Sequence, residues 1–144
     1  MTSDNERRLQ EGLSAMERGD IEPILAFSDP EVEFVNPPTA LEPGTRHGIE
    51  GLRVALHGML DVFEELRFDT EDVIDLGDRL VATGVFRGRG KGSGYQFDPV
   101  PFGFIAWLRD GRMIRYEWFA GPEEAMRAAG VSDPDAPESE RMSI

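Results

Sequence analysis

The sequence contains no cysteine and only two histidines among its 144 residues. The absence of cysteine excludes disulfide bonds, thiolate metal sites and a cysteine nucleophile. The histidines, His47 and His57, lie ten positions apart without the His-x-x-x-His or acidic spacing of a zinc site. We therefore predict no metal site and no bound cofactor.

Positive charge is also scarce in this chain. Fifteen Lys and Arg residues face 28 Asp and Glu residues, which gives a formal net charge of -13 at pH 7. A chain of this sign repels phosphate backbones and anionic lipid headgroups. We therefore expect neither a nucleic-acid partner nor a membrane partner. The glycine-rich segment 88–94, GRGKGSG, lacks the pattern of a phosphate-binding loop and indicates a hairpin turn.

Long apolar runs are absent. No stretch approaches the roughly 18 consecutive apolar residues of a membrane-spanning helix. Residues 1–12, MTSDNERRLQEG, lack the apolar core of a secretion signal, so we expect a cytoplasmic protein. The length fits one domain, which we assign to residues 1–130. Residues 131–144 form an acidic, polar tail that we expect to be disordered.

Apolar residues at helical spacing predict three helices in the first half of the chain. The first spans residues 5–18, with Leu9, Leu13 and Met16 on one face and a stop at Gly19. A short second helix spans residues 20–27. The third spans residues 48–65 and carries the longest apolar stripe, made of Ile49, Leu52, Leu56, Met59, Leu60 and Phe63.

Strand patterns fill most of the remaining sequence. They cover residues 31–36, 67–75, 79–89, 95–108 and 113–120, and Asp110-Gly111 joins the last two as a hairpin turn. Three prolines and a glycine in residues 37–47 predict a loop. Pro122 and Gly130 mark the start and end of a final helix. This order predicts an α+β fold with a mainly antiparallel sheet.

Both faces of the hairpin over residues 102–119 are largely apolar. Alternation predicts an inner face with Phe104, Ala106, Leu108, Ile114, Tyr116 and Trp118, and an outer face with Ile105, Trp107, Met113, Arg115, Glu117 and Phe119. A sheet with one side in water would show one polar face. We therefore expect helices on one face and a second subunit or more sheet on the other.

The apolar residues of the outer face, extended to the neighbouring strand, favour a protein interface. The set comprises Val81, Thr83, Val85, Ile105, Trp107 and Phe119. A contiguous apolar patch of this kind is unusual on a monomer. We therefore predict a homodimer through the outer sheet face, with Arg115 and Glu117 at the interface.

Three short motifs point to a known family. Arg18-Gly19-Asp20, His47-Gly48-Ile49-Glu50-Gly51 and Asp110-Gly111-Arg112-Met113 occur in an order and spacing that resemble the SnoaL-like branch of the nuclear transport factor two-like superfamily. The resemblance covers about residues 5 to 130, and segments 87–94 and 124–130 are similar to a largely uncharacterised bacterial subgroup. It implies a cone, in which a curved mixed sheet wraps around the three N-terminal helices, encloses a pocket and often forms a dimer through its outer face.

The chain lacks the catalytic residues of two well-known branches of this superfamily. Matching to the ketosteroid isomerases places Gly12 at their helix-one tyrosine, Asn36 at their carboxylate base and Phe104 at their oxyanion acid. Asn36 cannot take up a proton at neutral pH. Matching to the limonene epoxide hydrolases keeps Arg79 at best, and residues 120–121 replace their final acid. Neither set of catalytic groups is present.

We predict a ligand pocket from the inner-facing residues. The seven candidates are Asn36, Leu56, Met59, Phe86, Phe104, Tyr116 and Trp118. Asn36 could hydrogen-bond a ligand oxygen, or it could cap the turn into the proline-rich loop. Tyr116 and Trp118 could stack on a flat ligand, or they could be plain core residues.

The histidines are weaker candidates for the pocket. His57 lies beside the apolar stripe of the third helix, which indicates a partly exposed position. His47 could lie at the mouth of a pocket, but the sequence offers it no partner acid. Either imidazole could act as an acid or base near neutral pH.

Two functions from different classes fit the sequence. The first is a pocket protein for a small apolar or cyclic, polyketide-like or terpenoid-like compound, with or without isomerase, cyclase or hydrolase activity. Such an enzyme would work by hydrogen-bond polarisation and positioning. The second is a non-catalytic dimeric binding or assembly domain. Ala82 and Gly84 on the inner face favour a cavity, whereas the lack of an inner acid favours the second function.

Overall fold

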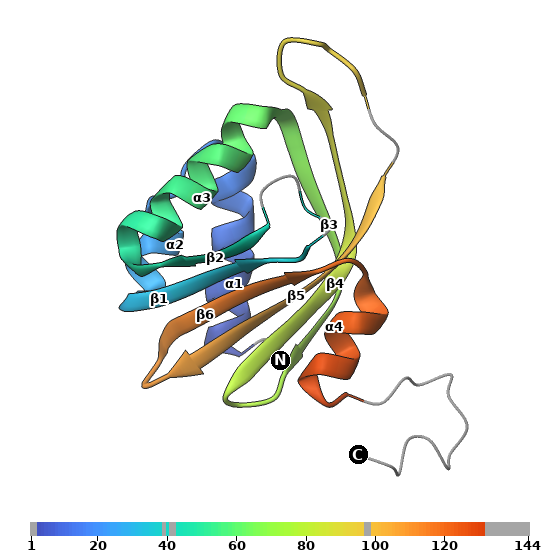
Figure 1. Cartoon of the computed structure of the whole chain (residues 1–144). Coiled ribbons are helices and arrows are strands. Elements are labelled where there is room, and N and C mark those ends of the chain that lie inside the picture. The colour runs from blue at the N-terminus through green and yellow to red at the C-terminus, as the bar shows by residue number, and fades with distance from the viewer. Residues whose placement is uncertain (1–2, 39, 41–42, 97–98, 132–144) are drawn as a thin grey trace, which may run out of the picture.

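One six-stranded sheet and four helices form an α+β fold in the computed structural model (Figure 1), which describes residues 3–38, 40, 43–96 and 99–131. The elements are α1 (Asp4–Glu17), α2 (Glu22–Phe27), β1 (Ser28–Asn36), β2 (Gly44–His47), α3 (Gly48–Val62), β3 (Phe63–Asp75), β4 (Arg79–Gly90), β5 (Val100–Arg109), β6 (Arg112–Phe119) and α4 (Pro122–Ala129). The predicted fold class is confirmed. The predicted tail lies outside the described residues from position 132 onward.

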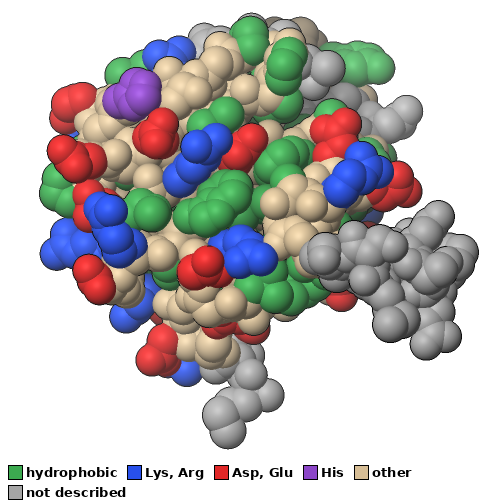
Figure 2. All heavy atoms as spheres, turned by 60° about the horizontal axis from the view of Figure 1, so that its bottom comes forward, with side chains coloured by type: hydrophobic (Ala, Val, Ile, Leu, Met, Phe, Trp, Pro, Cys, Tyr) green, Lys and Arg blue, Asp and Glu red, His purple; other side chains and the backbone are tan. Residues whose placement is uncertain are grey.

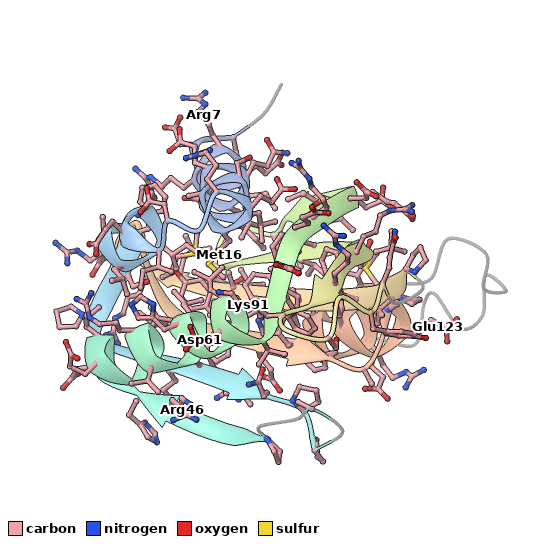
Figure 3. The ribbon with its side chains drawn as sticks, turned by 90° about the horizontal axis from the view of Figure 1, so that it is seen from above. Arg7, Met16, Arg46, Asp61, Lys91 and Glu123 are labelled. Atoms are coloured by element: carbon pink, nitrogen blue, oxygen red, sulfur yellow. The ribbon has the colours of Figure 1, made fainter. Side chains whose placement is uncertain are left out.

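The strand order in the sheet is β2-β1-β6-β5-β4-β3. All neighbours are antiparallel except β1 and β6, which pair in parallel and so place the first strand of the chain beside the last. The sheet curves around α1, α2 and α3. Side chains such as Met16 fill the space between helices and sheet, whereas Arg7 and Glu123 project outward (Figure 3).

Helix and turn signals in the sequence account for the main boundaries. The Ser3 hydroxyl accepts a hydrogen bond from the Glu6 backbone N–H at 3.1 Å and caps α1. Gly130 ends α4 in the left-handed conformation, with φ 79°. Asp110 and Gly111 both have positive φ, at 53° and 78°, as a two-residue hairpin turn requires.

Three predicted boundaries were wrong. Residues 37–47 were expected to be a loop, but β2 pairs with β1 from Glu33↔His47 to Asn36↔Gly44. The third helix ends at Val62, and the chain enters β3 directly at Phe63. The strand expected from residue 95 begins only at Val100.

A β-bulge overturns two of the predicted faces. Trp107 pairs with Arg115 and Leu108 with Met113, so Ile114 is the extra residue in β6. Met113 therefore lies in the main core, with 1% of its surface exposed. Ile114 lies on the outer face instead, beside Trp107. The alternation that placed Ile114 inside and Met113 outside is wrong at this point.

Helix α4 covers part of the outer sheet face. Ala125 and Ala129 of α4 are buried against Val81 and Ile105 of the sheet. The Arg79 guanidinium holds the last turn, since its Nε and Nη2 donate to the Ala129 carbonyl oxygen at 2.9 and 2.6 Å. The outer face was expected to meet a second subunit or more sheet, and this part of it meets the chain's own helix instead.

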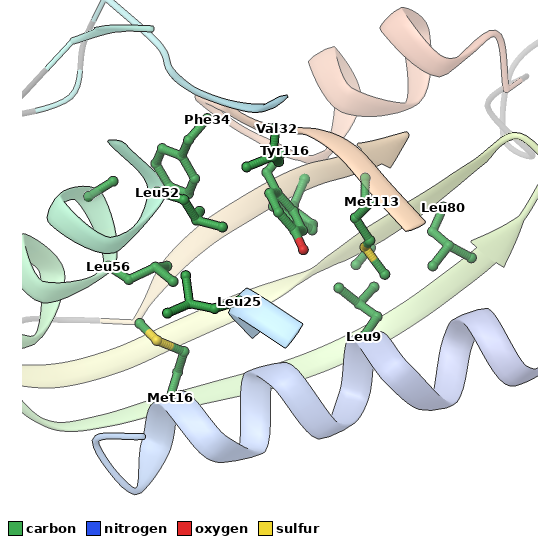
Figure 4. Close-up of a cluster of buried hydrophobic side chains, with 14 of the residues drawn as sticks. Leu9, Met16, Leu25, Val32, Phe34, Leu52, Leu56, Leu80, Met113 and Tyr116 are labelled. Atoms are coloured by element: carbon green, nitrogen blue, oxygen red, sulfur yellow. The ribbon is translucent and has the colours of Figure 1, made fainter. Parts of the chain in front are cut away.

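The main core lies between the inner sheet face and the three N-terminal helices (Figure 4). The helices contribute Leu9, Met16, Leu25, Leu52 and Leu56, and the sheet contributes Val32, Phe34, Leu80, Met113 and Tyr116. Within the part of the chain that the structure describes, no helix is long and apolar enough to cross a membrane.

Candidate functional site

A small cavity lies inside the main core, between the helices and the concave sheet face. Its sheet wall is made of Phe34, Phe68, Phe104, Met113, Tyr116 and Trp118. Its helix wall is made of Leu9, Gly12, Leu13, Met16, Ile24, Phe27, Leu52, Leu56 and Met59, together with Arg8. The walls thus come from elements spread over most of the chain, so this cavity is a product of the whole fold.

The cavity is tight. Its volume is about 40 Å³, whereas a cavity that binds benzene measures about 150 Å³. A ring-shaped ligand would therefore have to displace side chains. Met16, Met59 and Met113 all contribute to the wall, and methionine is the apolar side chain that adapts most readily to a new shape.

Aromatic rings dominate the sheet wall. The ring of Phe104 stacks on that of Tyr116, with centroids 5.8 Å apart and planes 21° apart. The indole of Trp118 lies 4.7 Å from Phe104, 5.6 Å from Phe102 and 6.2 Å from Phe68, measured between centroids. This wall offers flat aromatic surface on which a planar apolar ligand could lie.

The phenol of Tyr116 forms a hydrogen bond within the protein. Its oxygen lies 2.8 Å from the Ser28 hydroxyl oxygen. Because the Ser28 hydroxyl already donates to the Ile24 carbonyl oxygen at 2.6 Å, the phenol must be the donor in this pair. Burial raises the pKa of the Tyr116 phenol well above its usual range, because the phenolate would lose its hydration in the core. Tyr116 therefore stays protonated and neutral.

Among the described residues of the sheet wall, Trp118 carries the one side-chain N–H or O–H that has no hydrogen-bond partner. The indole nitrogen Nε1 is buried and has no hydrogen-bond acceptor among the described residues. A third polar side chain in the wall, Arg8, donates through Nη1 to the Gly111 carbonyl at 3.3 Å and to Asn5 Oδ1 at 3.5 Å.

These groups limit the chemistry of the cavity. Its described wall contains no carboxylate and no imidazole, so it offers no group that exchanges a proton near pH 7. His57 is exposed on α3. His47 has 73% of its side chain exposed and lies 3.8 Å from Glu33. The described residues also include no group of three or more His, Asp or Glu side chains that could hold a metal ion.

Five of the seven candidate pocket residues lie together in this wall, namely Leu56, Met59, Phe104, Tyr116 and Trp118. Asn36 and Phe86 do not. Asn36 is the last residue of β1, opposite Gly44. Phe86 packs edge-on against Phe63 at 6.4 Å.

Several wall residues were not among the candidates. Phe34 alternates with Val35 on β1, so the same reasoning that selected Asn36 could have selected it. Met113 was assigned to the wrong face because of the bulge at Ile114. Gly12 had been matched to a catalytic tyrosine of the isomerases, and the structure places this glycine in the helix wall of the cavity.

A second hollow lies on the outer sheet face. It is a groove of about 600 Å³ lined by Asp29, Glu31, Glu33, Trp107, Arg109, Ile114, Arg115 and Glu117. The Arg115 guanidinium lies 5.4 Å from the Trp107 ring centroid, and its Nη2 lies 3.1 Å from Glu117 Oε1. Figure 2 shows exposed hydrophobic side chains that lie between basic and acidic side chains on this side of the molecule.

Known structures share this fold. An NTF2-like protein of unknown function from Burkholderia pseudomallei superposes with a TM-score of 0.74 at 23% identity, over 88% of this chain and 97% of that one. TerC, crystallised with polyporic acid, gives 0.70 at 27% identity, over 81% of this chain and 91% of that one. A putative SnoaL-like polyketide cyclase from Jannaschia sp. gives 0.71 at 18% identity, over 83% and 89%.

The sequence itself matches a family as well. No protein with a curated description matches the chain. The pattern of the SnoaL-like domain matches residues 9–116, which include every strand except the last residues of β6. This match covers well over half of the sequence and agrees with the fold. The chain therefore belongs to the SnoaL-like domain family.

Proposed function

We propose that this protein binds a small, mostly apolar molecule in the cavity between the helices and the sheet. The observation that carries the proposal is the composition of the wall, in which stacked aromatic rings face flexible methionine side chains and no charged group other than Arg8 takes part. Ligand sites of this kind bury an apolar body and fix it with few polar groups. TerC, which shares this fold, was co-crystallised with a small organic molecule, polyporic acid, and this supports a role in small-molecule binding.

Binding without acid-base catalysis fits the wall best. A general base needs a pKa near the working pH, and the described wall offers only a neutral phenol, an indole and a guanidinium. A reaction in this cavity would have to proceed by positioning the substrate and polarising it through hydrogen bonds. The isomerase, cyclase or hydrolase types therefore rank below a binding role.

Methionine methyl groups provide a direct test. The protein has six methionines. Met16, Met59 and Met113 line the cavity, whereas Met126 belongs to α4 and packs against the cluster on the opposite sheet face. Titration with a small aromatic compound, followed by NMR of ¹³C-methyl methionine, should shift the first three signals and leave Met126 unchanged. The proposal would be contradicted if only the Met126 methyl signal shifted. It would also be contradicted if no methyl signal shifted with any of a panel of cyclic ketones, lactones, epoxides and hydrocarbons.

We also propose that the protein forms a homodimer through the outer groove. The groove combines acidic side chains of β1 with Arg109 and Arg115, so two copies related by a two-fold axis could pair opposite charges. Trp107 in the groove is half-buried within one chain, and aromatic side chains are enriched at protein interfaces. A dimer of this kind is compatible with either a binding or an assembly role. The cytoplasmic location expected from the sequence stays a prediction.

A further inference from the structure

We infer that Trp118 anchors the ligand, by donating its indole N–H to an acceptor oxygen that the ligand carries on an otherwise apolar body. This inference rests on the proposed function of the cavity and names the chemistry of the molecule bound there. It assigns Trp118 as the residue that decides between an oxygenated ligand and a hydrocarbon of the same shape.

The first step is the state of the indole nitrogen. Nε1 of Trp118 is buried, and none of the described residues offers it an acceptor. The ring neighbours of the indole are Phe68, Phe102 and Phe104, which present only carbon and hydrogen. The wall of the cavity exposes almost only apolar surface, so a ligand would reach Nε1 by displacing the side chains that cover it, as the small volume already requires. A buried donor without a partner costs free energy that a bound acceptor would then recover.

The second step is that the neighbouring donors are already used. The Tyr116 hydroxyl, two residues earlier on β6, donates to Ser28, which in turn donates to Ile24. Arg8 directs Nη1 toward Gly111 and Asn5. Trp118 is therefore the uncommitted neutral donor in the described wall.

The third step concerns the acceptor. A carbonyl oxygen, as in a ketone, ester, lactone or quinone, accepts a hydrogen bond and brings no hydrogen that needs a partner of its own. An alcohol or amide would add a donor hydrogen, and the one hydroxyl in the described wall, that of Tyr116, is buried beside Ser28. A carboxylate would lose its hydration in an apolar cavity. The wall therefore favours a flat carbonyl compound.

The indole N–H itself reports on this contact. The protein has two tryptophans, so a ¹H–¹⁵N spectrum contains two indole signals, and the Trp107→Phe variant on the outer face identifies that of Trp118. Acetophenone and isopropenylbenzene have nearly the same shape, but only the first carries an acceptor oxygen. Acetophenone should move the Trp118 signal downfield and leave that of Trp107 in place, and isopropenylbenzene should move it much less.

Affinity provides the second measurement. Trp118→Phe keeps an aromatic ring and removes the N–H, so it should weaken acetophenone about tenfold and isopropenylbenzene less than about twofold. Trp107→Phe should change neither affinity. If Trp118→Phe fails to fold, the comparison of the two probes on the native protein still decides the question.

The outcomes separate this inference from the proposed function. If both probes shift the methyl signals of Met16, Met59 and Met113 with equal affinity, and the Trp118 indole signal responds alike to both, the cavity binds apolar molecules and the anchoring role of Trp118 is wrong. If neither these probes nor the panel above perturbs those methyl groups, the proposed function fails and the inference fails with it.

Discussion

The phenolic oxygen of Tyr116 lies 2.8 Å from the hydroxyl oxygen of Ser28, a residue 88 positions earlier in the chain. The Ser28 hydroxyl continues the chain of hydrogen bonds to the Ile24 carbonyl at 2.6 Å. The pair thus joins β6, the first residue of β1 and helix α2 at the edge of the cavity. It also settles the role of the phenol, which donates to the protein and does not stand free for a ligand.

Removing either partner of this pair should destabilise the protein to different extents. Tyr116→Phe deletes the donor and leaves Ser28 bonded to Ile24, so it should lower the free energy of unfolding by about 1 kcal/mol. Ser28→Ala leaves a buried phenol hydrogen without an acceptor and should cost more, about 1 to 3 kcal/mol. Urea unfolding of both variants and of the double variant checks the order. A Ser28→Ala variant as stable as the native protein would show that the phenol has another acceptor.

The same phenol predicts a loss of stability in alkali. Burial raises the pKa of Tyr116 in the folded protein above the ordinary value of 10.0, so above pH 10 the unfolded chain loses a proton that the folded chain keeps. The folded state then binds more protons, and stability falls as pH rises, by about 1.4 kcal/mol at pH 11. Tyr116→Phe should remove this part of the pH dependence, which urea unfolding at pH 8 to 11 would measure. Parallel curves for the two proteins would contradict it.

Close approach of α4 to the sheet makes Gly103 a sensitive position. A Cβ atom on Gly103 would lie 2.5 Å from Ala125 Cβ and 2.6 Å from the Gly121 carbonyl oxygen, whereas a Cβ on Gly121 would meet nothing within 4 Å. Gly103→Ala should therefore displace α4 and lower the free energy of unfolding by about 1 to 3 kcal/mol. Gly121→Ala, with φ -173°, is the matched control and should change it little. Thermal unfolding distinguishes them, and equal effects would mean that α4 adjusts freely.

Local signals were sufficient to predict most of the fold. Glycines at positions 19 and 130, Pro122 and the Asp110-Gly111 turn mark the boundaries that the structure confirms. Strand β2 was missed because its residues carry no apolar alternation and β1 alone provides its partner. The bulge at Ile114 was missed because Met113 and Ile114 are both apolar, so hydrophobicity does not show which of them faces the core.

Alternation also predicted part of the candidate site. Phe104, Tyr116 and Trp118 face the cavity because strand parity holds beyond the bulge. Alternation along a strand predicts which face of the sheet a side chain lies on, but not how far along the strand the cavity extends. Asn36 and Phe86 therefore fall outside the wall. The part of the wall that comes from α1 and α2 depends on how these helices pack against each other, and apolar periodicity along the sequence does not show that packing.

The final prediction concerns the outer groove. Trp107 lines this groove, and the Arg115 guanidinium lies 5.4 Å from the centroid of the Trp107 ring. Trp107→Glu would add a carboxylate to a groove that already contains Asp29, Glu31 and Glu33, so two copies should repel each other. Sedimentation equilibrium should show a dimer for the native protein and a monomer for this variant.

A matched substitution separates loss of the interface from loss of the fold. Val54 on α3 is 52% exposed and lies on the helix layer, away from the groove. Val54→Glu makes the same kind of change in charge and should leave the dimer intact. Circular dichroism of Trp107→Glu should match that of the native protein, because Trp107 lies outside the main core and only borders the buried cluster that includes Ala125 and Ala129 of α4. A Trp107→Glu variant that remains dimeric would place the association surface on another face, and a native protein that sediments as a monomer would exclude the homodimer.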